Sequence, residues 1–161
     1  MGVDISGRKP KTEEGDYFAS NWWGWRPINA ICQMASYKSK LKIDFSYWGS
    51  NDGKGLRTQK QCDKLADAIE EFISDGMNEF LTDDDDRIYI VMGSWCEAGT
   101  GKFIGSEIEQ SLNQQFEYGT IQYSSIVTES GMRVESAHST SLGRIKNFIT
   151  FLRNCGGFQI W

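Results

Sequence analysis

The residues best suited to recognition chemistry are a run of tryptophans followed by an arginine near the start of the chain. Tryptophan joins a large apolar ring to one N–H donor, and tryptophan and arginine are enriched among the residues that carry the binding energy of protein interfaces. Neighbouring side chains of a regular element point in different directions, so we expect one or two of these rings to enter the core and the rest to lie exposed beside the arginine. A purely structural cluster is the alternative. The candidate binding residues are Trp22, Trp23, Trp25 and Arg26.

A run of four aspartates is the second candidate for binding. Its carboxylates could present an acidic face to a basic partner, and carboxylate oxygens also bind Ca²⁺. An EF-hand loop that began at Asp83 would need glycine and glutamate where Ile88 and Ser94 stand, so this calcium motif is excluded. A solvated acidic loop and weak cation binding remain as alternatives. The run consists of Asp83, Asp84, Asp85 and Asp86.

The chain contains no complete catalytic motif. The sequence GTGK at 99–102 matches only part of a phosphate-binding loop, because Cys96 stands at the first glycine position and Phe103 replaces the hydroxyl residue. The one histidine, His138, has no sequence feature that places it against a nucleophile. We therefore predict no catalytic residue and no cofactor. An enzyme would need a site assembled from dispersed residues, for which the candidates are Asp52, Cys96, Lys102 and His138.

The cysteines do not form a zinc motif. None of the four belongs to a C-x-x-C pair, and the chain has a single histidine, so a sequence-local metal site is excluded. Cys32, Cys62 and Cys155 lie on the apolar faces of predicted helices, which favours buried, reduced thiols.

Length and composition are those of one globular domain spanning residues 1–161, since 39% of the residues are hydrophobic and 13% are aromatic. The net charge of −5 argues against direct binding to nucleic acid, whose backbone is held mainly by Lys and Arg. No apolar run approaches the roughly 18 residues of a membrane span, and no secretory signal opens the sequence. We expect a cytoplasmic protein with no membrane contact.

Apolar periodicity predicts the elements that position these residues. A polar, turn-rich segment covers 7–21, and Pro27 is expected to be the first residue of a helix that ends near Ser39. The apolar spacing from 62 to 73 predicts a helix capped by Thr58 and stopped by Gly76. A third helix is expected from 142 to the stop at 156–157, and the spacing of Ile108, Leu112 and Phe116 allows a further short helix at 106–116. Strands are expected at 3–6, 41–48, 88–92, 121–124, 132–135 and 158–161.

These elements predict an α+β fold. Three amphipathic helices must each lay an apolar stripe on a shared sheet or on another helix, and the short strands favour a small, mainly antiparallel sheet. The tryptophan run precedes the first predicted helix, where at least one indole should fill the core.

Four motifs carry a resemblance to a known group of proteins: GVDISG at 2–7, WWGWRP at 22–27, NDGKGL at 51–56 and FLRNCGGFQI at 151–160. In this order they resemble a family of short, uncharacterised proteins encoded by bacteriophages and bacterial genomes. Some members carry a cysteine pair that looks like a zinc knuckle, but Cys96 stands alone here, so no zinc role is carried over. The resemblance covers both ends of the chain and not the middle, from about residue 77 to 138.

The resemblance and the absence of catalytic motifs together predict a non-enzymatic, phage-type accessory protein that binds a macromolecule. The expected partner is a host protein, and inhibition of a host or defence protein is the role that such an origin implies. A small enzyme with a dispersed site and a structural or assembly protein of a virus particle are the alternatives.

Overall fold

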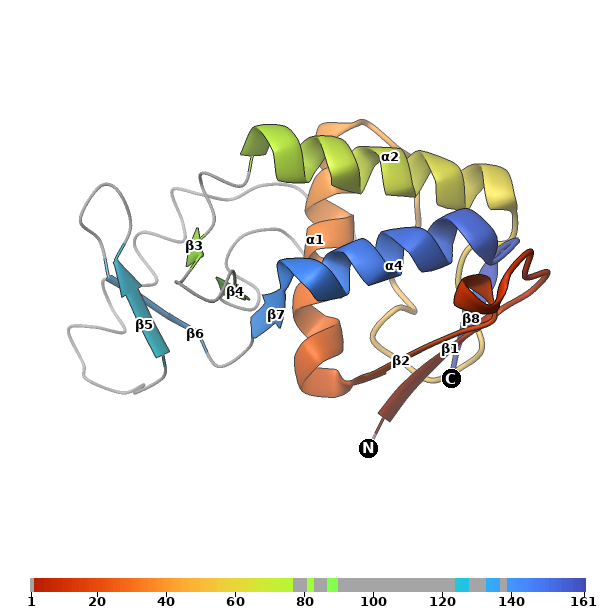
Figure 1. Ribbon diagram of the computed structural model, residues 1–161, viewed down its shortest axis with the longest axis horizontal. Helices are drawn as coiled ribbons and strands as arrows, with labels where there is room; N and C mark the ends of the chain where they lie inside the picture. Colours follow the sequence, from red (N-terminus) through yellow and green to blue (C-terminus); the bar gives the residue numbers. More distant parts are fainter. Residues whose placement is uncertain (1, 77–80, 83–86, 90–123, 128–132, 137–138) are drawn as a thin grey trace.

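The computed structural model describes residues 2–76, 81–82, 87–89, 124–127, 133–136 and 139–161. Within these residues the chain has the expected α+β fold, with helices packed on one face of a small antiparallel sheet (Figure 1). Helices α2 and α4 lie side by side and α1 runs across them. The helices are α1 (Trp22–Lys38), α2 (Gln59–Gly76) and α4 (Leu142–Asn154), and a short 3-10 turn, η1, covers Glu13–Gly15.

The main sheet joins the two ends of the described chain. Its strand order is β2-β1-β8, and both pairings are antiparallel. Ile5 lies opposite Phe18 on one side and Ile160 on the other, and all three side chains are buried beneath the helices. Successive side chains of a strand alternate between faces, so Asp4 and Ser6 point outward. The strands are β1 (Gly2–Gly7), β2 (Tyr17–Asn21) and β8 (Phe158–Ile160).

Five shorter strands lie beyond this sheet. One antiparallel sheet has the order β3-β4-β7, and β5 pairs with β6 in an antiparallel ladder that sets Ile126 opposite Val134. Strand β6 overlaps the strand predicted at 132–135, whereas β5 shares only Ser124 with the strand predicted at 121–124, whose residues 121–123 lie outside the described part. The strands are β3 (Leu81–Thr82), β4 (Arg87–Tyr89), β5 (Ser124–Val127), β6 (Arg133–Ser136) and β7 (Ser139–Ser141).

Helix α1 begins five residues earlier than predicted. Asn21 is its N-cap, and its side-chain oxygen accepts a hydrogen bond of 2.7 Å from the Gly24 N–H. Pro27 therefore lies inside the helix, where its ring supplies no N–H donor, instead of at the first position. The Asn21 cap sets the start because it satisfies a backbone donor of the first turn. The predicted end is confirmed, since Ser39 is the C-cap.

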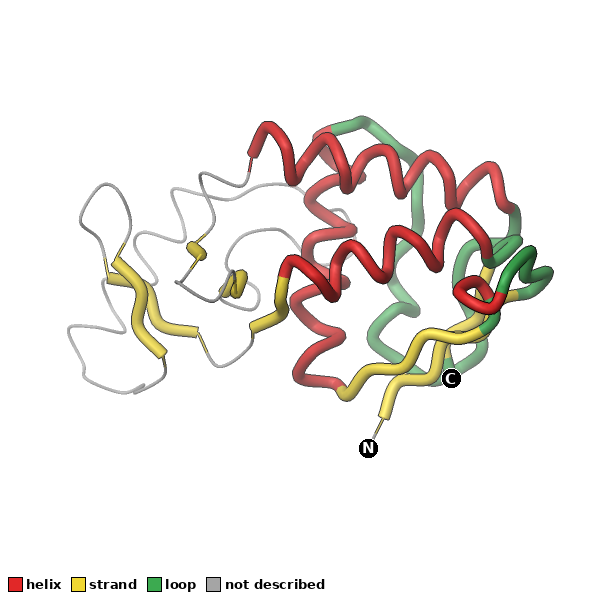
Figure 2. Tube along the Cα trace, in the orientation of Figure 1, coloured by secondary structure: helices red, strands yellow, loops and turns green. Residues whose placement is uncertain are grey.

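The predicted strand at 41–48 is wrong. The segment is a loop that ends in turns, although its burial does alternate as expected, with Leu41 and Ile43 partly buried and Phe45 buried (Figure 2). The carboxylate of Asp44 accepts the Ser46 N–H at 2.9 Å and closes a turn. No described strand pairs with this segment, so its apolar side chains reach the core without a ladder.

Strand β2 was not predicted, because the segment 7–21 looked like a polar connection. Only one of its side chains, Phe18, is buried, and it packs edge-on against Phe148 at a centroid distance of 5.1 Å. Pairing with β1, a non-local event, makes this short polar segment a strand.

The other two helices begin where the sequence predicts, and α4 ends just before the predicted stop at 156–157. Helix α2 is described as far as Gly76, and residues 77–80 lie outside the described part. Thr58 and Gln61 form a reciprocal capping box at the start of α2, with the Gln61 N–H donating to Thr58 Oγ1 and the Thr58 N–H donating to Gln61 Oε1, both at 3.2 Å. Ser141 caps α4 by accepting the Arg144 N–H at 3.2 Å. After α4, Gly156 and Gly157 take φ values of +66° and +92°, which turn the chain into β8.

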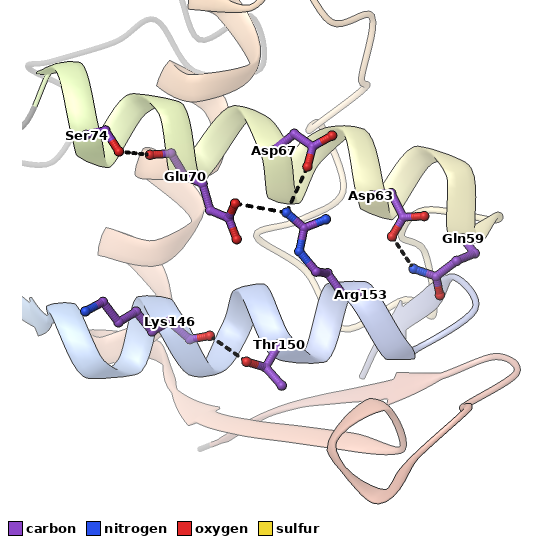
Figure 3. A network of polar contacts seen from close by, with 8 residues as sticks. All are labelled: Gln59, Asp63, Asp67, Glu70, Ser74, Lys146, Thr150 and Arg153. Atoms are coloured by element: carbon purple, nitrogen blue, oxygen red, sulfur yellow. Dashed lines mark hydrogen bonds and ion pairs between the residues drawn. The ribbon is translucent and has the colours of Figure 1, made fainter.

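Polar side chains join α2 to α4 along their outer edge (Figure 3). The Arg153 guanidinium contacts the carboxylates of Asp67 and Glu70 at 2.8 and 3.0 Å, and the bond to Asp67 is the main reason why the pKa of Arg153 is raised. Nearer the start of α2, Gln59 donates to the Leu152 carbonyl oxygen and accepts the Gly156 N–H, at 2.8 and 2.7 Å. Gln59 thus satisfies backbone groups where α4 ends.

Aromatic rings form the centre of the core. Trp25 stacks on Trp48 at a centroid distance of 6.1 Å, and Trp48 meets Phe158 edge-on at 5.2 Å. Phe148 contacts both Trp25 and Phe158, so α1, the 41–48 loop, α4 and β8 share one cluster. Rings in such offset and edge-on contacts stabilise each other beyond the area they bury.

Candidate functional site

The three tryptophans of the candidate site separate into a core residue, an intermediate one and an exposed one. Trp25 is completely buried, and its Nε1–H donates to the Trp48 carbonyl oxygen at 2.8 Å. It therefore belongs to the core and is removed from the set of candidate binding residues. Trp22 is partly buried against the same core. Trp23 remains, with 62% of its surface exposed.

Trp23 and Arg26 form a single surface, which we call the Trp23–Arg26 surface. They are three residues apart on α1 and so lie on the same side of its first turns. The guanidinium carbon of Arg26 is 5.8 Å from the centroid of the Trp23 ring, within the range of a cation–π contact. This contact orders both exposed side chains with an attraction of about 0.5–1 kcal/mol.

The surface is held by a rigid support. Beyond the first turn, α1 is buried from Pro27 to Ser36 apart from the partly exposed Asn29, because other parts of the chain pack around it. The Asn21 cap fixes the first turn, and Gly24 lets the helix pass close to Ser20, whose Oγ lies 3.0 Å from the position of a Cβ at Gly24. A side chain on such a support loses little conformational freedom on binding.

The other predicted site residues are not brought to this surface by the described structure. Asp83 to Asp86 lie outside the described residues, as do Cys96, Lys102 and His138. Asp52 is exposed in the loop before Gly53. Within the described ranges, no group of three or more histidine, cysteine or acidic residues is arranged to hold a metal ion.

The predicted burial of the cysteines is confirmed for the three described ones. Cys32, Cys62 and Cys155 are buried free thiols, and Cys155 Sγ donates to Cys62 Sγ at 3.6 Å. Burial raises the pKa of the Cys32 thiol far above its usual range. A buried thiol that keeps its proton is a poor nucleophile, so Cys32 serves as a core residue.

Sequence reasoning missed a second group of exposed aromatic side chains on the outer face of the main sheet. Tyr17 and Trp161 are 52% and 49% exposed. The alternation of the closing strand does predict that Trp161 lies on the other face of the sheet from the buried Ile160. No local pattern predicts β2, so the orientation of Tyr17 could not be predicted either.

Comparison of the chain with protein-family models, with curated proteins and with solved structures finds no match. Among the described residues, no helix combines the length and the apolar character needed to cross a bilayer.

Proposed function

We propose that this protein acts by binding another protein, without catalysis, and that the Trp23–Arg26 surface is part of the contact. The observation that carries the proposal is the 62% exposure of Trp23 beside the Arg26 guanidinium on a capped, buried helix. A large ring left in water costs free energy that a partner's pocket recovers, and this pair of residue types is enriched at binding hot spots.

The charge of the chain supports a protein partner over a nucleic acid. A net charge of −5 repels phosphates, whereas a protein partner requires only local complementarity at the contact. The run Asp83 to Asp86 would add a second, acidic contact to a basic region of the same partner. The contribution of this run to binding can be tested by its own variant, because its residues are distant in sequence from the Trp23–Arg26 surface.

The resemblance to phage and bacterial proteins supports a more specific role. On this proposal the protein is a phage-type accessory factor that binds a host protein in the host cytoplasm and inhibits it, with a defence protein as the natural target. A stable symmetric oligomer with a large apolar interface would instead support a structural role in a virus particle.

Affinity capture from the lysate of the native host tests the proposal, with the wild-type chain beside Trp23→Ala and Arg26→Ala. We expect one stoichiometric partner whose affinity falls about 30-fold in Trp23→Ala, the equivalent of a 2 kcal/mol hot spot. The matched control is Tyr37→Ala, which removes an exposed aromatic ring from the far end of the same helix.

Three outcomes are distinguishable in this experiment. Equal binding by Trp23→Ala and wild type would remove the Trp23–Arg26 surface from the proposal. Loss of binding on reversing the charges of Asp83 to Asp86 alone would place the contact at the acidic run. Recovery of no partner, with a folded protein that turns over a small molecule, would overturn the proposal in favour of an enzyme.

A further inference from the structure

Asp4, Tyr17 and Trp161 lie on the outer face of the main sheet. Asp4 lies at the centre on β1, with Tyr17 on β2 and Trp161 just after β8 on either side. Asp4 and Trp161 form a backbone pair through two hydrogen bonds, of 2.9 and 2.6 Å, which places their side chains next to each other on one face. The Tyr17 hydroxyl donates to Asp4 Oδ1. We call these three residues the Asp4 aromatic site.

We propose that the Asp4 aromatic site binds the guanidinium group of an arginine presented by a partner protein. A carboxylate accepts the forked N–H donors of a guanidinium, and flanking aromatic faces attract its positive charge. Arginine fits better than lysine because its planar, weakly hydrated cation both stacks on a ring and forms paired hydrogen bonds.

The charges around the site favour a cation supplied from outside. Among the described residues, the ion pairs are those of Arg153 on the helical side of the molecule, and none involves Asp4. Tyr17 supplies a neutral hydrogen bond to one carboxylate oxygen, a bond that also raises the pKa of the Tyr17 phenol. The Asp4 carboxylate therefore forms no ion pair with a described residue, in a chain whose net charge is −5.

The Trp161 ring is held in place from below. A Cβ at Gly53 would lie 2.6 Å from the nearest ring atom of Trp161, so the ring packs on the Gly53 backbone. Gly53 also has a φ of +76°, a conformation that favours glycine. The Gly53 N–H donates to the Ile160 carbonyl oxygen at 2.8 Å and ties this loop to the edge of β8. About half of the Trp161 surface remains exposed for a ligand.

A partner must approach the face of the sheet rather than the edge at β2. At that edge, the Arg144 guanidinium donates to the Ala19 carbonyl oxygen at 2.5 Å and also lies over the Phe18 ring, 4.6 Å from its centroid. A strand from another protein could not pair with Ala19 without displacing this contact. Both of these Arg144 contacts lie away from the outer face that holds Asp4 and Tyr17.

An NMR titration of the ¹⁵N-labelled full chain with blocked peptides tests the proposal directly. The probe is acetyl-Gly-Arg-Gly-amide, compared with the same peptide carrying lysine or the uncharged arginine analogue citrulline. We expect saturable shifts at the Asp4 amide and the Trp161 indole N–H, with about tenfold weaker binding of the citrulline peptide, which has lost the charge. The lysine peptide should bind more weakly than the arginine peptide.

The variants separate the site from general charge attraction. Asp4→Asn and Trp161→Ala should each weaken binding at least several-fold, whereas Glu71→Gln, which removes one negative charge from an exposed position on α2, should leave it unchanged. Retained core resonances show that each variant is folded. Equal binding of all three peptides, an equal effect of Glu71→Gln, or no saturable shift would overturn the proposal. Trp23→Ala should bind the peptide normally, so this result is independent of the proposed function.

Discussion

Two tryptophans separated by one residue illustrate how position on a helix decides the role of a side chain. Trp25 and Trp23 are about 200° apart around the axis of α1, because each residue advances the helix by about 100°. Trp25 is thereby directed into the aromatic core, where it donates to Trp48, and Trp23 is directed into solvent beside Arg26. The same substitution at the two positions should therefore have very different consequences.

Trp25→Ala should lower the free energy of unfolding by about 3–5 kcal/mol, because it removes a buried ring and leaves a cavity. Trp23→Ala should lower it by about 1 kcal/mol or less, because it removes an exposed ring and the cation–π contact with Arg26. Urea unfolding followed by circular dichroism measures both values. Similar losses in the two variants would contradict the assignment of Trp23 to a binding surface.

The buried Cys32 thiol predicts a dependence of stability on alkaline pH. The pKa of Cys32 is raised in the folded protein by burial, whereas a thiol in the unfolded chain ionises near pH 8.5. The contribution of the protonated Cys32 thiol to the free energy of unfolding is fully present below about pH 8.5. It is lost as the pH rises toward the pKa of the folded state, because over this range only the unfolded state releases the proton.

Urea unfolding at about pH 7.5 and 9.5 checks this prediction. Between these values the wild type should lose about 1.4 kcal/mol more stability than Cys32→Ala does, the amount for one thiol that titrates only when unfolded. Comparing the pH-dependent change in each protein removes the cost of the substitution itself. An identical pH dependence would show that the Cys32 thiol is not protected by the fold.

At the scale of elements, the connection from α4 to β8 depends on two glycines. Gly157 has a φ of +92°, and a Cβ on it would lie 2.5 Å from the Arg57 carbonyl oxygen. Backbone, not a flexible side chain, occupies that position, so the chain cannot accommodate a larger residue without moving the loop that precedes α2. This close passage brings Phe158 under the helices and Trp161 beside Asp4.

Gly157→Ala should destabilise the protein by more than 1 kcal/mol, because alanine is strained at positive φ and would collide with backbone. Gly143→Ala is the matched control: it makes the same chemical change inside α4, where nothing lies closer than 3.9 Å to the new Cβ. That variant should gain about 0.5 kcal/mol or less from better helix propensity, because Gly143 lies in the first turn of α4. Thermal unfolding of the pair would show opposite signs, and equal shifts would contradict the geometry.

At the scale of the whole molecule, the sheet closes the fold by pairing strands from opposite ends of the described chain. β1 lies between β2 and β8, and the termini emerge close together at this sheet (Figure 1). Phe158 and Ile160 are completely buried, and Phe158 contacts rings from α4 and from the 41–48 loop. Burying two such side chains stabilises the fold by about 3–6 kcal/mol, which is comparable with the total stability of a small domain.

Deletion of residues 158–161 should therefore leave most of the chain unfolded at room temperature, with loss of the dispersed amide signals of β1. The double variant Gln159→Ala/Trp161→Ala, which changes only the outward side chains of the same segment, should remain folded. NMR spectra of the two proteins decide the question. A folded truncated chain would show that the helices alone sustain the core.

The sequence alone was sufficient for the elements whose signals are local. The apolar spacing of α2 and α4, the cap of α2 at Thr58, and the alternation of β8 are properties of neighbouring residues, and the α+β class follows from them. The burial of three cysteines was predictable for the same reason. The binding role of the Trp23–Arg26 surface and of Asp83 to Asp86 remains a prediction.

Only the tertiary structure decided which segments pair and which residues meet. Phe18 becomes part of a strand because its segment pairs with β1. The segment 41–48 alternates apolar and polar residues more regularly, yet it is not a strand because no described strand pairs with it. The same non-local pairing brings Asp4 and Trp161, 157 positions apart, onto one face. Backbone hydrogen bonds between distant strands carry no local signature in the sequence, so such neighbours follow from the fold and not from the spacing of the residues.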